Sequence, residues 1–345
     1  MKNDSITILK AFGILFMVLA HAGCPKLLHD FIYMFHMPLF FIASGYCFKE
    51  KYLQDNKTFI IRRIKGLYVP FVKWSLIFLA LHNVFFYLNI YNGFYGFHGT
   101  VSSLYTWKDF LIAAKDIITR MMNNPQLLGG YWFLREMLWG TIISLFVLKY
   151  LRSPVWSMIL MLILSIACKI LNLHVPYWGL GSLTFLSASF FIAGYMFRKL
   201  LIASNINISW GGVNVICLIT VAIGSLLMPS NMLNYTTWQI IPYSICAIAG
   251  TWLFFNISKA IANTTSHWKK FMVFVGDNTM TILTWHFLCF KLVSLLIIGV
   301  YGLPIERLAE FPVIEEFSSW WIVYFIVGVG IPMLGVFFYN RIRSE

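Results

Sequence analysis

Long runs of apolar residues, separated by short polar segments, recur along the whole chain. A helix needs about 20 apolar residues to cross the hydrocarbon core of a bilayer, and most of these runs approach that length. No stretch between them is long enough for a sizeable soluble domain. The pattern predicts ten membrane-spanning helices, at residues 6–22, 31–48, 67–87, 131–148, 154–172, 182–197, 209–228, 236–256, 279–300 and 319–339.

Composition strengthens this interpretation. The chain has 345 residues, of which 59% are hydrophobic and 11% are charged. Soluble domains are about 25% charged, so a soluble fold is excluded. We predict an all-α polytopic membrane protein, a bundle of about ten helices that forms a single integral-membrane domain over residues 1–345. The first apolar run contains Lys10 and His21 and no small-residue cleavage pattern, so we expect a retained span and not a signal peptide.

The distribution of basic residues predicts the orientation. With ten spans, 16 of the 26 Lys and Arg residues fall on the side that holds both termini, 5 fall on the other side and 5 lie within spans. This excess predicts that both termini are cytoplasmic. Orientation therefore accounts for the net charge of +13, and we expect no nucleic-acid partner. The six cysteines show no CxxC spacing, so neither a disulfide framework nor a metal site is predicted.

Two predicted external loops have distinctive patterns. Residues 88–130 contain an amphipathic stretch, 107–122, which we expect to lie along the outer interface as a helical lid. The last loop contains Glu306, Glu310, Glu315 and Glu316, and we expect it to be a solvated connector.

The first span carries the most conspicuous chemistry. An ionisable residue inside a bilayer costs about 2.5–3.5 kcal/mol on insertion scales, and this span has both Lys10 and His21. Their separation is close to three helical turns, which places both on one face, roughly 16 Å apart. By composition alone, His21 is equally well explained as a histidine at the outer interface, and Lys10 as a lysine that reaches the inner headgroups.

The sequence resembles the bacterial integral-membrane acyltransferase 3 family, particularly its sugar O-acetylating members. The resemblance is carried by Lys10 and His21 with ten residues between them, followed by HMPLFFIASGY at 36–46. Within that segment, Pro38 interrupts the backbone pattern, and Ser44 with Gly45 lets another helix approach closely. The stretches YWFL at 131–134, FFIAGY at 190–195, and GDNTM at 276–280 leading to His286 extend it in order over nearly the whole chain.

The resemblance implies an O-acyltransferase of the bacterial inner membrane. Its expected co-substrate is cytoplasmic acyl-CoA, with acetyl-CoA first among the donors, and no cofactor is permanently bound. The expected acceptor is a hydroxyl of a cell-envelope glycan or of a lipid-linked sugar. There are two departures from the family pattern. Thr7 occupies a position where many members have an acidic residue. Counted back from Pro70, the family's Arg-x-x-Arg element is matched at Arg63, whereas Gly66 stands at the second Arg position and Arg62 and Lys65 are the candidate substitutes.

The basic segment at 62–65 and the first span suggest a division of roles. Arg62, Arg63 and Lys65 suit the phosphates of acyl-CoA, although the positive-inside rule also explains them. Lys10 would lie along the path of the pantetheine arm. His21 would act as general base on the acceptor hydroxyl, or as the nucleophile of an acyl-histidine intermediate.

Further polar residues are candidates for acceptor or supporting roles. These are His36, Ser44, Trp132, Arg135, Glu136, Asn278 and His286. Arg135 and Glu136 are sequence neighbours, which do not face each other on a helix, so an ion pair between them is not implied. Glu136 is a candidate buried carboxylate, and Arg135 could be its partner only if that helix end is irregular. Asp277 and Asn278 are expected to cap the ninth span.

Two alternatives belong to other classes. A transporter or flippase of a glycan intermediate would line its path with Lys10, Arg135, Lys169 and Lys291. The absence of an internal repeat weakens that alternative. A non-catalytic accessory protein would tolerate the loss of His21.

Overall fold

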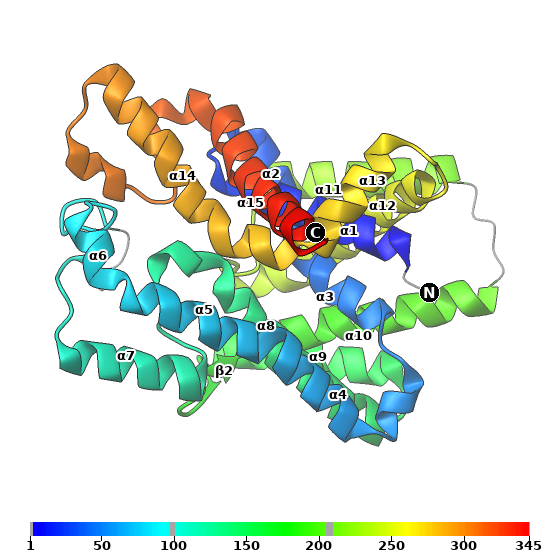
Figure 1. Ribbon diagram of the computed structural model, residues 1–345. Helices are drawn as coiled ribbons and strands as arrows, with labels where there is room; N and C mark the ends of the chain where they lie inside the picture. Colours follow the sequence, from blue (N-terminus) through cyan, green and yellow to red (C-terminus); the bar gives the residue numbers. More distant parts are fainter. Residues whose placement is uncertain (1–2, 97–100, 205–209, 345) are drawn as a thin grey trace. The chain divides into compact units, whose positions relative to one another are not determined.

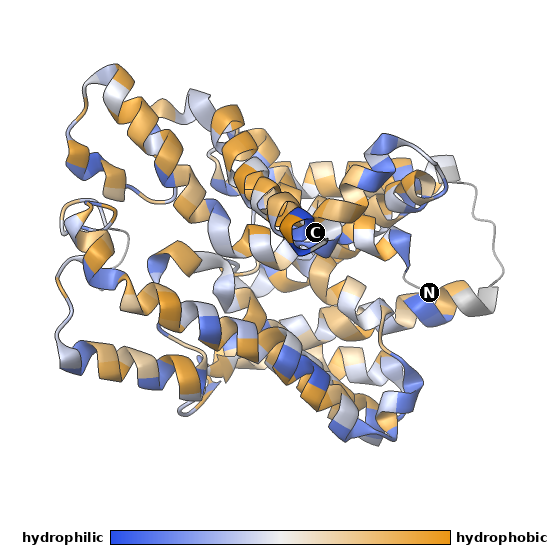
Figure 2. Ribbon diagram, in the orientation of Figure 1, coloured by the Kyte–Doolittle hydropathy of each residue, from blue (hydrophilic) through white to orange (hydrophobic). Residues whose placement is uncertain are grey.

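The computed structural model describes residues 3–96, 101–204 and 210–344, and most of them are helical. In these ranges the only strands are β1 (His174–Val175) and β2 (Leu180–Gly181), which form one short antiparallel hairpin. The predicted all-α class is therefore confirmed. Figure 2 shows hydrophobic residues along most of the length of helices such as α14 (Thr279–Tyr301) and α15 (Trp321–Ser344).

The described chain forms two compact units, each assembled from three segments of the sequence (Figure 1). The first unit comprises Met1–Gly13, Asp30–Tyr68 and Phe133–Asp277. The second comprises Ile14–His29, Val69–Trp132 and Asn278–Glu345. Helices α1 (Asp4–His21) and α2 (Lys26–Tyr33) contribute residues to both units, so Lys10 and His21 lie in different units although one helix carries them.

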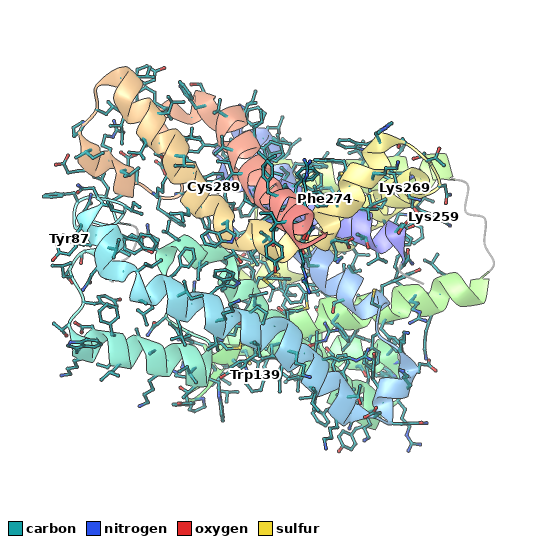
Figure 3. The ribbon with its side chains drawn as sticks, in the orientation of Figure 1. Tyr87, Trp139, Lys259, Lys269, Phe274 and Cys289 are labelled. Atoms are coloured by element: carbon teal, nitrogen blue, oxygen red, sulfur yellow. The ribbon has the colours of Figure 1, made fainter. Side chains whose placement is uncertain are left out.

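The first unit contains most of the helices. Beyond the start of α1, these are α3 (His36–Tyr46), η1 (Glu50–Leu53), α4 (Asn56–Arg63), the π-helical turn η2 (Ile64–Tyr68), α8 (Trp132–Leu151), α9 (Pro154–Ile170), α10 (Ser182–Ser204), α11 (Trp210–Leu227), η5 (Thr237–Gln239), α12 (Ile240–Ala262) and α13 (His267–Asp277). Helix α10 packs against α9 and α3, and α12 packs against α11 and α3. Lys269 of α13, labelled in Figure 3, pairs with Asp4 of α1 at 3.1 Å.

The crossing of α3 and α10 depends on two glycines. A Cβ atom at Gly45 would lie 1.8 Å from the carbonyl oxygen of Phe191, and one at Gly194 would lie 2.0 Å from that of Ile42. The two backbones are therefore in direct contact, as small residues permit between membrane helices. This confirms the close approach expected at Gly45. Pro38 is tolerated because it lies in the first turn of α3, where backbone N–H groups have no intrahelical acceptor.

The second unit is built around α14, which packs against α15. Its other elements are α5 (Val69–Ala80), α6 (His82–Tyr87), α7 (Trp107–Arg120), η4 (Gln126–Tyr131), η6 (Ile305–Ala309) and η7 (Glu315–Trp320). The predicted amphipathic helix is confirmed as α7, which begins with a capping box between Thr106 and Asp109. Its placement at the outer interface as a lid stays a prediction.

Within the described ranges, six helical segments are long and apolar enough to cross a membrane. They are Asp4–His21, Lys26–Tyr46, Gln126–Leu151, Thr237–Ala262, Thr279–Tyr301 and Glu315–Arg343. Pro154–Ile170 and Gly211–Leu227 are apolar but shorter. The predicted span at 67–87 is divided between α5 and α6. A multi-pass membrane protein is thus supported, while the count of ten and the cytoplasmic termini stay predictions.

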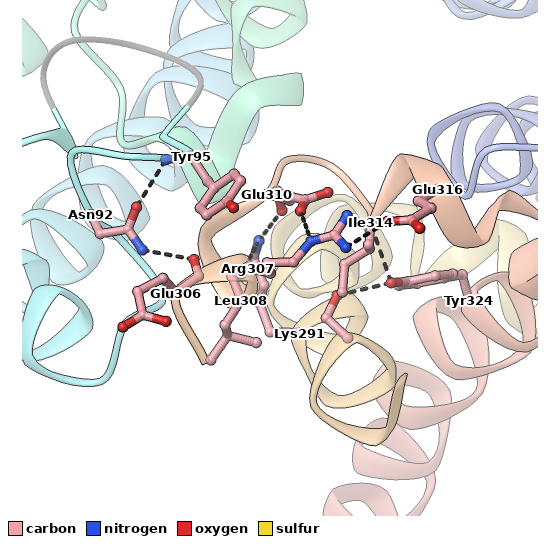
Figure 4. Close-up of polar contacts among 11 residues, drawn as sticks. Asn92, Tyr95, Lys291, Glu306, Arg307, Leu308, Glu310, Ile314, Glu316 and Tyr324 are labelled. Atoms are coloured by element: carbon pink, nitrogen blue, oxygen red, sulfur yellow. Dashed lines mark hydrogen bonds and ion pairs between the residues drawn. The ribbon is translucent and has the colours of Figure 1, made fainter. Parts of the chain in front are cut away.

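The acidic loop, predicted to be a solvated connector, has exposed carboxylates at Glu315 and Glu316 but is also held against α14 by further contacts. Arg307 contacts the carboxylates of Glu310 at 2.5 Å and Glu316 at 2.6 Å (Figure 4). The buried ammonium of Lys291, on α14, donates to the carbonyl oxygens of Leu308 at 2.9 Å and Glu310 at 2.6 Å. The loop folds onto α14 because it supplies acceptors to a cation that hydrocarbon cannot solvate.

The α3–α10 crossing yields a stability prediction. We expect Gly194→Ala to destabilise the protein, because the added methyl group forces two backbones apart, at a cost of about 1–3 kcal/mol. Gly335→Ala on α15 is the matched control, since no atom lies within 4 Å of its added Cβ. Thermal unfolding in detergent measures both variants. Equal melting temperatures for the two would contradict the close crossing.

Candidate active site

The second unit brings two histidines together. His21 ends α1 and is partly exposed, whereas His286 lies inside α14 and is fully buried. Nδ1 of His21 lies 3.3 Å from Nε2 of His286. Phe287 packs against both imidazoles, with ring centroids 4.9 Å from His21 and 3.9 Å from His286. The pair is therefore a polar contact within an aromatic environment.

The hydrogen bonds of His286 assign the tautomer of both rings. Its Nδ1 lies 3.0 Å from the carbonyl oxygen of Ile282 and 3.1 Å from that of Leu283. A carbonyl oxygen only accepts, so Nδ1 carries the hydrogen and Nε2 of the neutral ring is an acceptor. Nδ1 of His21 must then donate to it. This assignment places the lone pair of neutral His21 on Nε2, as a general base requires.

The helix around His286 is also fixed by polar contacts. The hydroxyl groups of Tyr131 and Thr284 are 2.7 Å apart, and both residues are buried. Asn278 occupies the N-cap position of α14, as expected, but its side chain forms no capping hydrogen bond. Tyr131, the first residue of the YWFL stretch, therefore contacts the helix that follows the GDNTM stretch.

Lys10 lies in the first unit, where basic side chains converge. Its charge acts on the thiol of Cys47, together with the charges of Arg63, Arg198 and Lys49. Thr7, one turn before Lys10, is buried and faces Gly276, where a Cβ atom would lie 2.0 Å from the Thr7 carbonyl oxygen. Thr7, where the family resemblance implies an acidic residue, therefore packs against a neighbouring helix.

Arg62, Arg63 and Lys65, the expected phosphate-binding residues, lie in three different environments. Arg62 donates to the hydroxyl of Tyr52 at 2.8 Å. The guanidinium of Arg63 lies 4.8 Å from the ring centre of Phe59, and burial lowers its pKa to about 10, so it stays charged at neutral pH. Lys65 is exposed in the π-helical turn. Arg63 therefore stabilises the aromatic core of this unit, where Phe59 packs with Phe48 and Phe191.

Arg135 and Glu136 pair in the structure, although helical spacing alone does not imply the pair, and Glu136 is buried. Their side chains approach to 3.4 Å, and Glu136, which is 2% exposed, also accepts from the hydroxyl of Thr184 at 2.6 Å. Arg135 donates to the carbonyl oxygens of Trp178 and Gly179 in the β-hairpin loop. The hairpin turns the long Arg135 side chain back along α8, where the carboxylate lies. Trp139, labelled in Figure 3, packs against Trp178.

The remaining candidates, His36, Ser44 and Trp132, lie outside the histidine pair. His36 is buried, and its Nδ1 donates to the carbonyl oxygen of Ile32 at 2.9 Å. The buried hydroxyl of Ser44 has no hydrogen-bond partner in the described part of the chain. Trp132 begins α8 and is partly exposed. None of these three side chains takes part in the His21–His286 contact.

Sequence reasoning missed several of these partners. Thr184 gave no signal, because its role depends on how α10 packs beside α8. Arg198 and Lys199 lie two residues beyond the FFIAGY stretch at 190–195, and this position in the sequence was a usable signal.

Comparison with protein families identifies the chain. The sequence model of the acyltransferase 3 family, described as an acyltransferase domain, matches residues 3–339. The chain belongs to this family and is a membrane acyltransferase. A search of curated proteins and a search of solved structures each found no match.

The Arg135–Glu136 pair yields a second prediction. Arg135→Ala leaves a buried carboxylate with only Thr184 as a partner, and we expect a loss of up to about 3 kcal/mol of stability. Glu136→Gln in the same chain should recover part of this loss, because a neutral amide needs no counter-charge. Thermal unfolding of both single variants and the double variant measures the coupling. Additive effects would show that the pair contributes nothing.

Proposed function

We propose that this protein is an O-acyltransferase of the bacterial inner membrane. It moves an acyl group, acetyl first, from cytoplasmic acyl-CoA to a hydroxyl of a cell-envelope glycan or of a lipid-linked sugar. The observation that carries the proposal is the His21–His286 contact, which leaves the lone pair of His21 on Nε2. Family membership supports the acyl transfer itself.

The reaction follows from this assignment. Nε2 of His21 takes the proton of the acceptor hydroxyl while that oxygen attacks the carbonyl carbon of the thioester. The carbon–sulfur bond then breaks, and the CoA thiolate takes the proton back from His21. The products are an ester and CoA. The second route has Nε2 attack the thioester and form an acyl-histidine, which the acceptor hydroxyl then resolves.

The donor side belongs to the cations of the first unit. The phosphates of acyl-CoA cannot enter hydrocarbon, so we propose that they stay at the cytoplasmic face and bind basic side chains of the first unit. Lys10 is carried by the same helix as His21, and we assign it to the path of the pantetheine arm. The transporter alternative gains no support from the histidine pair, because a transport path needs no assigned tautomer.

The first test is transfer of radiolabelled acetyl from acetyl-CoA into envelope glycan by membranes that contain wild type or His21→Ala. We expect the rate of acetyl transfer by the variant to be lower by about 10²–10⁴-fold, because the general base is lost. Membrane insertion and folding are checked for both proteins. Equal transfer would exclude His21 as the catalyst, and no transfer by either would favour a different donor or the transporter.

The second test concerns His286 as a positioning residue. His286→Phe removes the acceptor for Nδ1 of His21, and we expect kcat to fall by about 10- to 100-fold while KM for acetyl-CoA is unchanged. His286→Gln keeps an acceptor near that place, and we expect it to recover part of the rate. Purified protein in nanodiscs provides kcat, KM and the pH profile. If His286→Phe and His286→Gln lowered kcat equally, the proposal that His286 fixes the tautomer of His21 would be wrong.

A further inference from the structure

The first unit contains an open pocket beside the end of α10. It has a volume of about 770 Å³, within the range of about 300–1,000 Å³ that is usual for small-molecule sites. Its lining residues come from the segment after α3 and from the last turns of α10: Phe48, Lys49, Glu50, Lys51, Tyr195, Arg198 and Lys199. Arg62, Arg63 and Lys65, the expected phosphate ligands, are not among them.

The charge of this pocket is strongly positive. Four of its residues are basic and only Glu50 is acidic. Glu50 contacts Lys199 at 2.8 Å and accepts from the hydroxyl of Tyr195 at 3.0 Å. These bonds lower the pKa of Glu50, and the bond with Glu50 raises the pKa of Lys199, so both are charged at neutral pH. Glu50 thus neutralises the charge of Lys199, and the other three cations leave the pocket with an excess of positive charge.

Part of the pocket is rigid. The Phe48 and Tyr195 rings are almost fully buried and pack edge to face, with centroids 5.5 Å apart. Arg198 donates from Nη1 to the carbonyl oxygen of Phe48 at 2.8 Å, which holds its guanidinium in place. Lys49 and Lys51 are exposed and flank Glu50 in sequence. A guanidinium held in place beside two exposed ammonium groups suits an anion that carries several phosphates.

The positive region also continues toward α1. Arg198 and Lys49 of the pocket, together with Arg63 and Lys10, are the cations whose charges act on the Cys47 thiol. Cys47 follows the end of α3, and Lys10 lies on the helix that ends at His21. Lys49 and Arg198 of the pocket and Lys10 of α1 therefore lie within electrostatic range of the same thiol.

We propose that this pocket binds the phosphates of the acyl-CoA nucleotide through Lys49, Lys51 and Arg198, and that Glu50 holds Lys199 until the nucleotide displaces it. The proposal rests on the proposed function, since acyl-CoA as the donor is part of that proposal. The phosphate subsite then lies in the pocket and not at Arg62, Arg63 and Lys65. The role of Arg63 is to pack against the aromatic core.

Binding of CoA to the purified protein in neutral-lipid nanodiscs tests the proposal by calorimetry, with pantetheine as the probe that lacks the nucleotide. We expect Lys49→Gln/Lys51→Gln to weaken CoA binding at least about tenfold, because two charge-assisted contacts are lost. Pantetheine binding should be unchanged. The control is Lys57→Gln/Lys270→Gln, which removes the same charge from exposed lysines outside the pocket and should change CoA binding less than about twofold.

Glu50→Gln supplies a gain-of-affinity test. It frees Lys199, and we expect CoA to bind about two- to fivefold more tightly, as an exposed ion pair allows. Weaker binding would overturn the role of Glu50 as a competitor for Lys199.

The possible results distinguish a failure of the pocket proposal from a failure of the proposed function. Wild-type CoA affinity in Lys49→Gln/Lys51→Gln, with acetyl transfer intact, would overturn the pocket and leave the acyltransferase standing. No CoA binding and no transfer by wild type would overturn both. A pocket for anionic lipid headgroups would keep CoA binding unchanged in the double variant and lower only the phosphatidylglycerol that copurifies, which also overturns the proposal.

Discussion

A polar side chain within a membrane-spanning helix must find its partner inside the protein, because hydrocarbon offers none. Three contacts follow from this constraint. His286 is satisfied by two carbonyl oxygens of its own helix and by His21. Glu136 is satisfied by Thr184 and Arg135, and the buried ammonium of Lys291 by the carbonyl oxygens of the loop before α15. The contacts of His286 with His21 and of Glu136 with Thr184 join segments that are distant in sequence, so the requirement that satisfies these polar atoms also ties distant helices together.

The same constraint has a chemical consequence at the histidine pair. A buried imidazole whose Nδ1 hydrogen is committed to a backbone carbonyl oxygen presents only an acceptor to its neighbour. The neighbour is then held in one tautomer. In the proposed function, the fully buried His286 orients the ring of the partly exposed His21. The basic residues of the first unit divide in a similar way, since Arg63 stabilises an aromatic core while Arg198 and the lysines line an open pocket.

Much of the architecture was predictable from the sequence, because apolar runs and basic loops are local properties. The helical class, the amphipathic helix α7 and the close packing at Gly45 were predicted, and the structure confirms them. The division of residues 67–87 into α5 and α6 was not predicted, since one continuous apolar run gave no sign of the break. Among the candidate residues, His21 and His286 were singled out separately, but nothing local indicated that they meet. The Arg135–Glu136 pair was not implied by the sequence, because neighbouring side chains point in different directions on a helix. In the structure, the loop of the β-hairpin holds the Arg135 guanidinium, which also contacts Glu136.

The sequence by itself determined which segments are helical and apolar, where cations accumulate and which residue types carry chemistry. It also carried the motifs that place the chain in its family. Only the tertiary structure decided which partner each buried polar atom has: His286 for His21, Thr184 for Glu136, and the loop carbonyl oxygens for Lys291. The physical reason is that helix formation follows from local backbone hydrogen bonds and hydropathy, whereas the pairing of buried polar groups depends on how distant helices pack.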